Sequence, residues 1–247
     1  MLRYAFAHPG KIGDALFTLP TIKYICERDN ATADFFTSNY CLPITPLFEY
    51  QSFIEKVIVP EEYIIRDMSC GVQPWEIPIP PGYDAIYQLG FRTTPDCALH
   101  TWIGRSAGIP DVPPPSYQYP DMTFFEEPYI VISARNPTTF NDTILDFINI
   151  CPIKTVQIGC PHEYLESKSV NMCHLNMLET VALMSKAVGF VGLPFSQLVL
   201  ANGFPNLIKV AMHTGAHWNM SHLIYGPNNH YPVLPSPEEV LRLLNLS

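Results

Sequence analysis

The run Gly10-Lys11-Ile12-Gly13-Asp14 combines two glycines with an acid, directly after the apolar segment 2–7. The glycines permit a sharp turn, and the apolar spacing beyond them predicts a helix. The start of a helix at the carboxyl end of a parallel strand is a common ligand position. Asp14 could act there as a general base, or could be an ordinary first-turn acid that the helix dipole stabilises.

Four residues around Asp14 complete this candidate substrate site. The run lacks the full P-loop pattern and the third glycine of a dinucleotide fingerprint, so the sequence predicts neither of those sites. We expect substrate contacts from His8, Gly10, Lys11 and Gly13.

The elements that position this run alternate between strands and helices, which predicts parallel sheets. In the first half of the chain we expect strands at 2–7, 33–37, 56–59 and 84–89, with helices at 13–28 and 96–107. In the second half we expect strands at 129–133, 154–158, 189–192 and 207–211, with helices at 141–150, 178–187, 196–202 and 240–246.

Proline interrupts this alternation in the middle of the chain. Of the 25 prolines among the 247 residues, 11 lie between Pro74 and Pro128. Because proline breaks helices and stiffens extended segments, the stretch 110–128 predicts a hinge between two domains. We therefore expect an N-terminal α/β domain at 1–120 and a C-terminal α/β domain at 121–247.

Composition and charge limit the classes of partner. Hydrophobic residues make up 47% of the chain and charged residues 15%, which is typical of a globular protein with a large core. The net charge of −9 argues against broad binding to nucleic acid or to an anionic membrane. No apolar run is long enough for a signal peptide or a membrane span, so we expect a soluble, cytoplasmic protein.

The metal-ligating residue types suggest no metal site. Seven cysteines without a C-x-x-C pair indicate reduced thiols, most of them in the core. The late histidines His213, His217, His222 and His230 lack zinc-site spacing and fall in a loop-rich region, where they could line a ligand site or simply face solvent.

A family resemblance follows from several short motifs in order. Residues 13–20 (G-D-A-L-F-T-L-P) resemble the G-D-x-L-x-T-L-P opening of the heptosyltransferases, glycosyltransferase family 9. These bacterial enzymes use ADP-heptose and have the GT-B fold, in which two Rossmann-like domains with parallel sheets face each other across a cleft. Further stretches resemble family motifs in order: 159–163 resembles G-x-P-x-E, 197–205 (Q-L-V-L-A-N-G-F-P) resembles H-L-A-A-A-L-G-x-P, and 225–228 resembles Y-G-P. The segments 178–184 and 190–192 resemble the family helix before the donor loop and the strand that follows it.

The resemblance implies roles for individual residues. Asp14 would be the general base of an inverting transfer in an acceptor-binding N-terminal domain, and Glu163 would bind the donor ribose in a nucleotide-sugar-binding C-terminal domain. Met177 lies near the position that contacts the base, although it could equally be a core residue. No D-x-D motif occurs, which agrees with a family that needs no metal or other cofactor. The implied donor-binding residues are Ser133, Arg135, Gly159, Glu163, Met177, Ser196 and Gln197.

Two departures from the family pattern affect the donor half. The family lysine after the strand at 129–133 is missing, and Arg135 could replace it on the phosphates or could be a solvated surface residue. The loop 193–197 (L-P-F-S-Q) is shorter than the family's D-[ST]-G-x-x-H, so its Asp is absent and Gln197 takes the His position. Ser196 and the backbone amides there could still hold a phosphate.

The sequence therefore predicts a metal-independent, inverting glycosyltransferase with a nucleotide-sugar donor. The acceptor hydroxyl could belong to a glycan, a lipopolysaccharide-type saccharide, a small molecule or a hydroxymethylated DNA base of the kind phage transferases modify. The chain is shorter than the family norm, which predicts a trimmed acceptor domain. We expect a monomer or small homo-oligomer. The alternative is a degenerate GT-B module that binds a nucleotide or sugar without catalysis.

Overall fold

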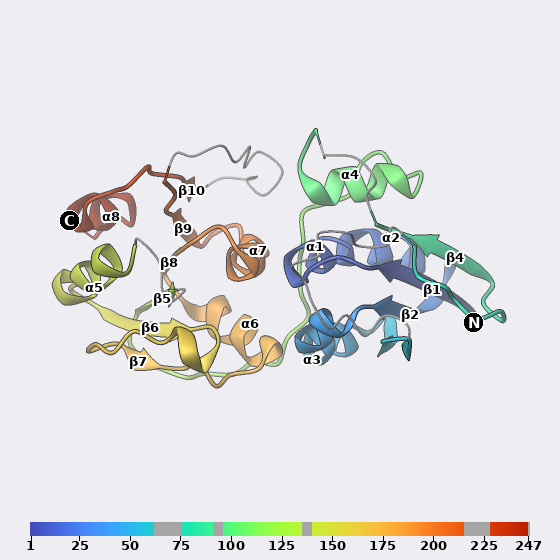
Figure 1. The fold of residues 1–247 in the computed structure, drawn as a ribbon, viewed down its shortest axis with the longest axis horizontal. Helices are drawn as coiled ribbons and strands as arrows, with labels where there is room; N and C mark the ends of the chain where they lie inside the picture. Colours follow the sequence, from blue (N-terminus) through green and yellow to red (C-terminus); the bar gives the residue numbers. More distant parts are fainter. Residues whose placement is uncertain (62–75, 91–95, 135–139, 215–227, 247) are drawn as a thin grey trace. The chain divides into compact units, whose positions relative to one another are not determined.

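Two parallel sheets, one in each half of the chain, organise the computed structural model (Figure 1). The structure describes residues 1–61, 76–90, 96–134, 140–214 and 228–246. The chain divides into two compact units, Met1–Tyr119 and Pro120–Ser247. The boundary thus falls inside the proline-rich stretch 110–128, and each unit is described by itself.

The first unit carries a four-stranded sheet in the order β3-β2-β1-β4, with all pairs parallel. His8, at the end of β1, pairs with Thr37, at the end of β2, so the carboxyl ends of these strands meet. The elements are β1 (Leu2–His8), α1 (Ile12–Leu16), α2 (Leu19–Asp29), β2 (Ala31–Thr37), η1 (Asn39–Ile44), α3 (Thr45–Glu49), β3 (Ile54–Ile58), β4 (Ala85–Gln88) and α4 (Leu99–Ser106).

The two faces of this sheet carry different side chains. On one face, Ala5, Ala7 and Phe36 pack against Ile77, which lies in the extended segment before β4. On the other face, Phe6 stacks on Tyr87 with ring centroids 4.8 Å apart. Alternation of side chains along β1 separates these two sets.

The predicted helix at 13–28 is in fact two helices, α1 and α2. Pro20 occupies the first turn of α2, where its missing N–H costs nothing, whereas inside one continuous helix it would clash with the carbonyl of the preceding turn. Thr18 is the N-cap residue of α2, and its hydroxyl donates to the Ala15 carbonyl oxygen at 2.7 Å. The prediction of a single helix was wrong because it ignored this proline.

The second unit carries a six-stranded sheet in the order β10-β9-β8-β5-β6-β7, again with all pairs parallel. Figure 1 shows α5 and α8 beside each other, and Ile130 and Ile132 of β5 pack in their hydrophobic cluster. On the opposite face, the Tyr129 hydroxyl donates to the Leu183 carbonyl oxygen of α6 at 2.7 Å. The elements are β5 (Tyr129–Ser133), α5 (Asn141–Ile150), β6 (Lys154–Ile158), η4 (Pro161–Glu163), β7 (Val170–Asn171), α6 (Met177–Lys186), β8 (Gly189–Gly192), α7 (Ser196–Asn202), β9 (Ile208–Ala211), β10 (Asn229–His230) and α8 (Pro237–Leu243).

Most of the predicted strands and helices are confirmed, several with the same bounds. The sequence interpretation assigned no element to η1 and α3, although Pro46 lies in the first turn of α3, where proline is a favoured helix start. It also missed β7 and β10, which have two residues each. No helix within the described residues is both long and apolar enough to cross a membrane.

The six cysteines in the described segments are all free. Cys26, Cys41, Cys151 and Cys173 are buried, as the sequence predicted for most of them, while Cys97 is half-buried and Cys160 is exposed. Cys70 lies outside the described residues.

Candidate functional site

A tight turn links β1 to α1 and brings together the residues predicted around Asp14. The Gly10 N–H donates to His8 Nδ1 at 2.9 Å, so Nδ1 carries no proton. His8 is 1% exposed, and this burial lowers the pKa of its imidazole to about 4. A Cβ on Gly10 would collide with His8 Cε1 and would lie 3.2 Å from Asp14 Cβ. Only glycine fits here without moving the ring.

Asp14 occupies the third position of α1 and folds back over the helix start. The Lys11 N–H donates to Asp14 Oδ2 at 3.4 Å, a long contact that is part of a capping box. Asp14 and Gly13 are half-buried and Lys11 is exposed. The carboxylate is thus oriented by the helix start and still reaches solvent.

Two residues that the sequence did not assign to the site fix the carbonyl groups of this turn. The Thr37 hydroxyl donates to the His8 carbonyl oxygen at 2.9 Å. The Cys41 thiol, on η1, donates to the Gly10 carbonyl oxygen at 3.2 Å. Burial raises the pKa of Cys41 to about 11, so the thiol keeps its proton. Nothing in the local sequence signals these contacts, because both donors lie far along the chain from the turn.

In the second unit, the carboxyl ends of three strands meet at one edge of the sheet. Ser133 at the end of β5 pairs with Ile158 of β6 and with Gly192 of β8. The predicted donor-binding segments 159–163 and 193–197 both start at this edge, which is the ligand-binding edge of open α/β sheets. Ser133 itself is 7% exposed. Arg135 lies outside the described residues.

The turn that holds Glu163 is shaped by Gly159. Gly159 has φ +129°, and a Cβ there would lie 2.7 Å from Glu163 Oε2. The same oxygen accepts from the Cys160 N–H at 2.9 Å. A carboxylate has about four acceptor sites, so this contact leaves Glu163 able to bind hydroxyl groups.

The remaining predicted donor-binding residues lie at the starts of two helices. Met177 is half-buried at the first position of α6, after the N-cap Asn176. At the start of α7, the Ser196 hydroxyl donates to Gln197 Oε1 at 3.0 Å, and both residues are half-buried. The Gln197 side chain therefore has a local partner in the position of the family histidine.

One turn gathers three side chains of metal-ligating type. Single ligand atoms of Cys160, His162 and Glu163 all lie within 4.8 Å of one another. Such a thiol, imidazole and carboxylate set could coordinate a divalent ion such as Zn²⁺. Of the late histidines, His213 Nε2 lies 3.2 Å from the Tyr231 carbonyl oxygen and His230 is part of β10. His217 and His222 fall outside the described residues.

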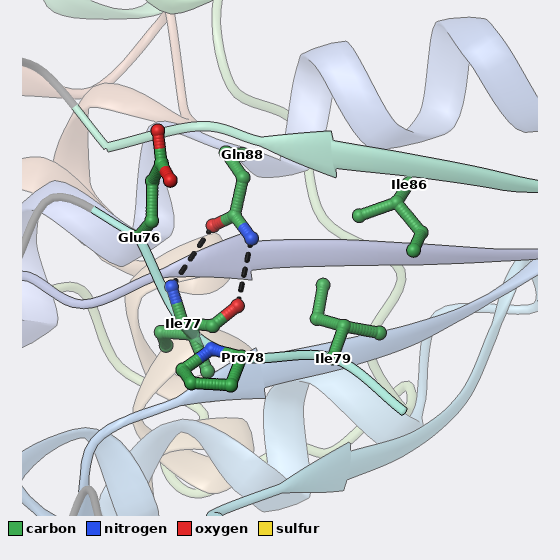
Figure 2. A pocket seen from close by; sticks show the side chains of 6 residues that line it. All are labelled: Glu76, Ile77, Pro78, Ile79, Ile86 and Gln88. Carbon is green, nitrogen blue, oxygen red and sulfur yellow. Dashed lines mark hydrogen bonds between the residues drawn. The ribbon is translucent and has the colours of Figure 1, made fainter. Parts of the chain in front are cut away.

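A cavity of about 420 Å³ lies beside β4, and its lining includes none of the predicted site residues. Figure 2 shows the Gln88 amide facing the backbone of Ile77: Nε2 donates to the Ile77 carbonyl oxygen at 2.7 Å, and Oε1 accepts from its N–H at 3.1 Å. These two hydrogen bonds hold the extended segment that contains Ile77 against the sheet and engage both polar atoms of the Gln88 side chain. The cavity is lined by Glu76, Ile77, Pro78, Ile79, Ile86 and Gln88.

Comparisons with known proteins identify the fold. Neither a protein-family model nor a curated protein sequence matches the chain. The E. coli heptosyltransferase WaaC, solved with ADP-2-deoxy-2-fluoro heptose, superposes with a TM-score of 0.69 at 11% identity, covering 99% of both chains. The family 9 glycosyltransferase of Veillonella parvula DSM 2008 gives 0.68 at 13% identity, covering 100% of this chain and 98% of that one.

A third solved structure is longer than this chain. TibC, an iron-containing dodecameric glycosyltransferase of enterotoxigenic E. coli H10407, gives a TM-score of 0.64 at 16% identity. The match covers 94% of this chain, which spans 63% of the TibC chain. The predicted GT-B class of fold, with two parallel α/β units, is thereby confirmed, and so is the likeness of this fold to the heptosyltransferases.

Proposed function

We propose that this chain is a metal-independent, inverting glycosyltransferase that moves a sugar from a nucleoside-diphosphate sugar to an acceptor hydroxyl. The observation that carries the proposal is the position of Asp14. Its half-buried carboxylate lies in the turn after β1, in a fold shared with heptosyltransferases.

The chemistry requires a base at the acceptor and a stabilised leaving group at the donor. The Asp14 carboxylate accepts the proton of the acceptor hydroxyl while that oxygen attacks the anomeric carbon. The new C–O bond forms on the face opposite the departing phosphate, so the configuration inverts. The bond from the anomeric carbon to the diphosphate oxygen breaks, and its electron pair leaves with the nucleoside diphosphate.

The donor site of the proposal is the strand edge of the second unit. Glu163 accepts hydrogen bonds from the ribose hydroxyls, with its turn held by Gly159, and Met177 lies near the base. Ser133, Ser196, Gln197 and the α7 backbone contact the phosphates, where Arg135 supplies positive charge. In support, WaaC and TibC have been solved with ADP-sugars. Because the loop 193–197 differs from the family pattern, the proposal leaves the nucleotide and the sugar open.

The acceptor is proposed to be a saccharide or a small hydroxylated molecule. A net charge of −9 disfavours duplex DNA, which proteins bind through clustered Lys and Arg. We place the protein in the cytoplasm, where its free cysteines stay reduced, as a monomer or small homo-oligomer.

A panel of UDP-, GDP-, ADP- and CMP-sugars tests this function. Calorimetry identifies the donors that bind, and hydrolysis or transfer from a binding donor is then measured for the wild type and for Asp14→Asn. The enzyme should bind at least one donor and turn it over, and Asp14→Asn should bind that donor normally but lose transfer. Full activity of Asp14→Asn would remove the base assignment.

The second candidate is a non-catalytic nucleotide- or sugar-binding module. It is favoured by the altered donor loop, in which Gln197 accepts from Ser196 within the loop itself. Under this alternative, a donor binds with a measurable affinity and no sugar is hydrolysed or transferred with any acceptor tested.

A further inference from the structure

We propose that His8 is a positioning residue whose buried ring shapes the turn that presents Asp14. The inference rests on the proposed function, because it gives His8 a role through the same Asp14 base. The turn geometry itself can be measured without any activity.

A hydrogen bond within the turn ties the His8 ring to the backbone. His8 Nδ1 accepts from the N–H of Gly10, two residues ahead, at 2.9 Å. In an Asx turn, an Asn or Asp oxygen accepts from the N–H two residues ahead in the same way. The imidazole therefore replaces an Asx side chain and sets where the backbone reverses between β1 and α1.

The His8 ring, Gly10 and Asp14 are closely packed. A Cβ on Gly10 would lie 2.8 Å from His8 Nδ1 and 3.2 Å from Asp14 Cβ. The His8 ring and Asp14 thus both crowd the side of Gly10 that a Cβ would occupy. Because α1 starts only two residues later, a shift of the ring displaces Gly10 and the first turn of the helix.

The His8 ring carries no charge in this turn. Nδ1 can accept this hydrogen bond only without a proton, and burial lowers the pKa of His8 to about 4. The ring is therefore neutral at pH 7, with its one proton on Nε2. A neutral ring adds no positive charge beside Asp14, whereas an imidazolium would stabilise the carboxylate and weaken it as a base.

Two variants separate the acceptor from the ring. His8→Phe keeps a planar ring but cannot accept from Gly10, whereas His8→Asn restores an acceptor in Asx-turn geometry. We expect His8→Phe to lower kcat by about 10- to 100-fold, the scale expected when a catalytic group is displaced by about 1 Å. The donor KM should stay within about twofold, because the donor residues lie on the other unit. His8→Asn should recover most of kcat, and both variants should show the wild-type circular dichroism spectrum.

A spectroscopic measurement on the wild type tests the turn directly, even where His8→Phe does not fold. Long-range ¹H–¹⁵N spectra of the wild type report which imidazole nitrogen carries the proton, and the His8 signal is the one missing from His8→Asn. We expect the Nε2–H form, unchanged between pH 5 and 8. A proton on Nδ1, or protonation near pH 6.5, overturns the inference.

The outcomes also separate this inference from the proposed function. If Asp14→Asn loses transfer but His8→Phe keeps the wild-type kcat, the positioning role is wrong and the glycosyltransferase stands. If no donor supports transfer, or Asp14→Asn stays fully active, the proposed function fails while the spectra still decide the state of His8.

Discussion

The Thr37 hydroxyl donates to the His8 carbonyl oxygen at 2.9 Å, joining the ends of β1 and β2 through a side chain where their regular pairing stops. Thr37 is fully buried. The candidate catalytic turn begins at His8. Its carbonyl group is therefore held by a side chain of β2, a strand that lies far from it in the sequence.

Removing that hydroxyl should destabilise the first unit. Thr37→Val keeps the shape of the side chain and leaves the buried His8 carbonyl oxygen without this donor, at a cost of about 1–2 kcal/mol in the free energy of unfolding. Urea titration measures the change. Thr32→Val, in the half-buried part of the same strand, is the matched control and should cost less. Equal losses for the two variants would argue against a role for this bond.

Gly10→Ala should impair the turn more severely. The new methyl group would overlap His8 Cε1, so the ring or the backbone must move. We expect at least a tenfold loss of transfer activity and a loss of about 1–3 kcal/mol in stability, typical of overpacking. Gly82→Ala is the control, since its methyl group meets nothing within 4 Å and strains only the backbone at φ +114°. That variant should lose stability but keep its activity.

Glu163→Gln should weaken binding of the donor and leave the rate of the chemical step nearly unchanged. The neutral amide is a poorer acceptor for the ribose hydroxyls, so we expect the donor KM to rise by about 5- to 20-fold with kcat within about twofold, on the order of 1–2 kcal/mol for charge-assisted hydrogen bonds. Glu179→Gln removes a similar capping carboxylate, which accepts from the Asn176 N–H at 2.9 Å. A matching rise in KM for that control would assign the Glu163 effect to lost capping.

Lys209 should make stability depend on alkaline pH. It is 2% exposed, its ammonium group donates to the Phe204 and Leu207 carbonyl oxygens, and burial lowers its pKa to about 8. Between about pH 8 and 10.4 the unfolded chain binds this proton while the folded chain does not, so the contribution of Lys209 to stability rises with pH. The free energy of unfolding of the wild type should therefore rise relative to that of Lys209→Met as the pH increases through that window. The exposed Lys56→Met variant controls for the loss of a lysine.

A good part of the fold could be read from local patterns. The apolar, β-branched run of β5 and the Ser236-Pro237 start of α8 each carry their own signal. The break between α1 and α2 could also have been predicted. Thr18 is a residue type that favours the N-cap position, and Pro20 lies two residues later, in the first turn of the new helix. The elements that the sequence interpretation missed are of two kinds. The strands β7 and β10 are too short to show a strand pattern, and η1 and α3 each contain a proline.

The candidate site was harder to predict, because its geometry depends on contacts between distant residues. The pattern of glycines and an acid located Asp14 near a turn, but the burial of His8 follows from the packing of the whole unit. The partners Thr37 and Cys41 come from β2 and η1, about thirty residues away, and no local spacing signals them. The structure places the buried ring of His8 against the backbone of Gly10, and the expected contact between His8 and substrate stays a prediction.

The separate sheets of the two units have a thermodynamic consequence. Each unit has a hydrophobic cluster of its own, around Phe36 in the first and around Ile132 in the second. A chain built this way need not melt in one step, and a single melting temperature then describes neither half. A ligand raises the melting temperature of the half whose folded form it binds. The melting curve can thus report which half is stabilised when a nucleotide sugar or a candidate acceptor is added.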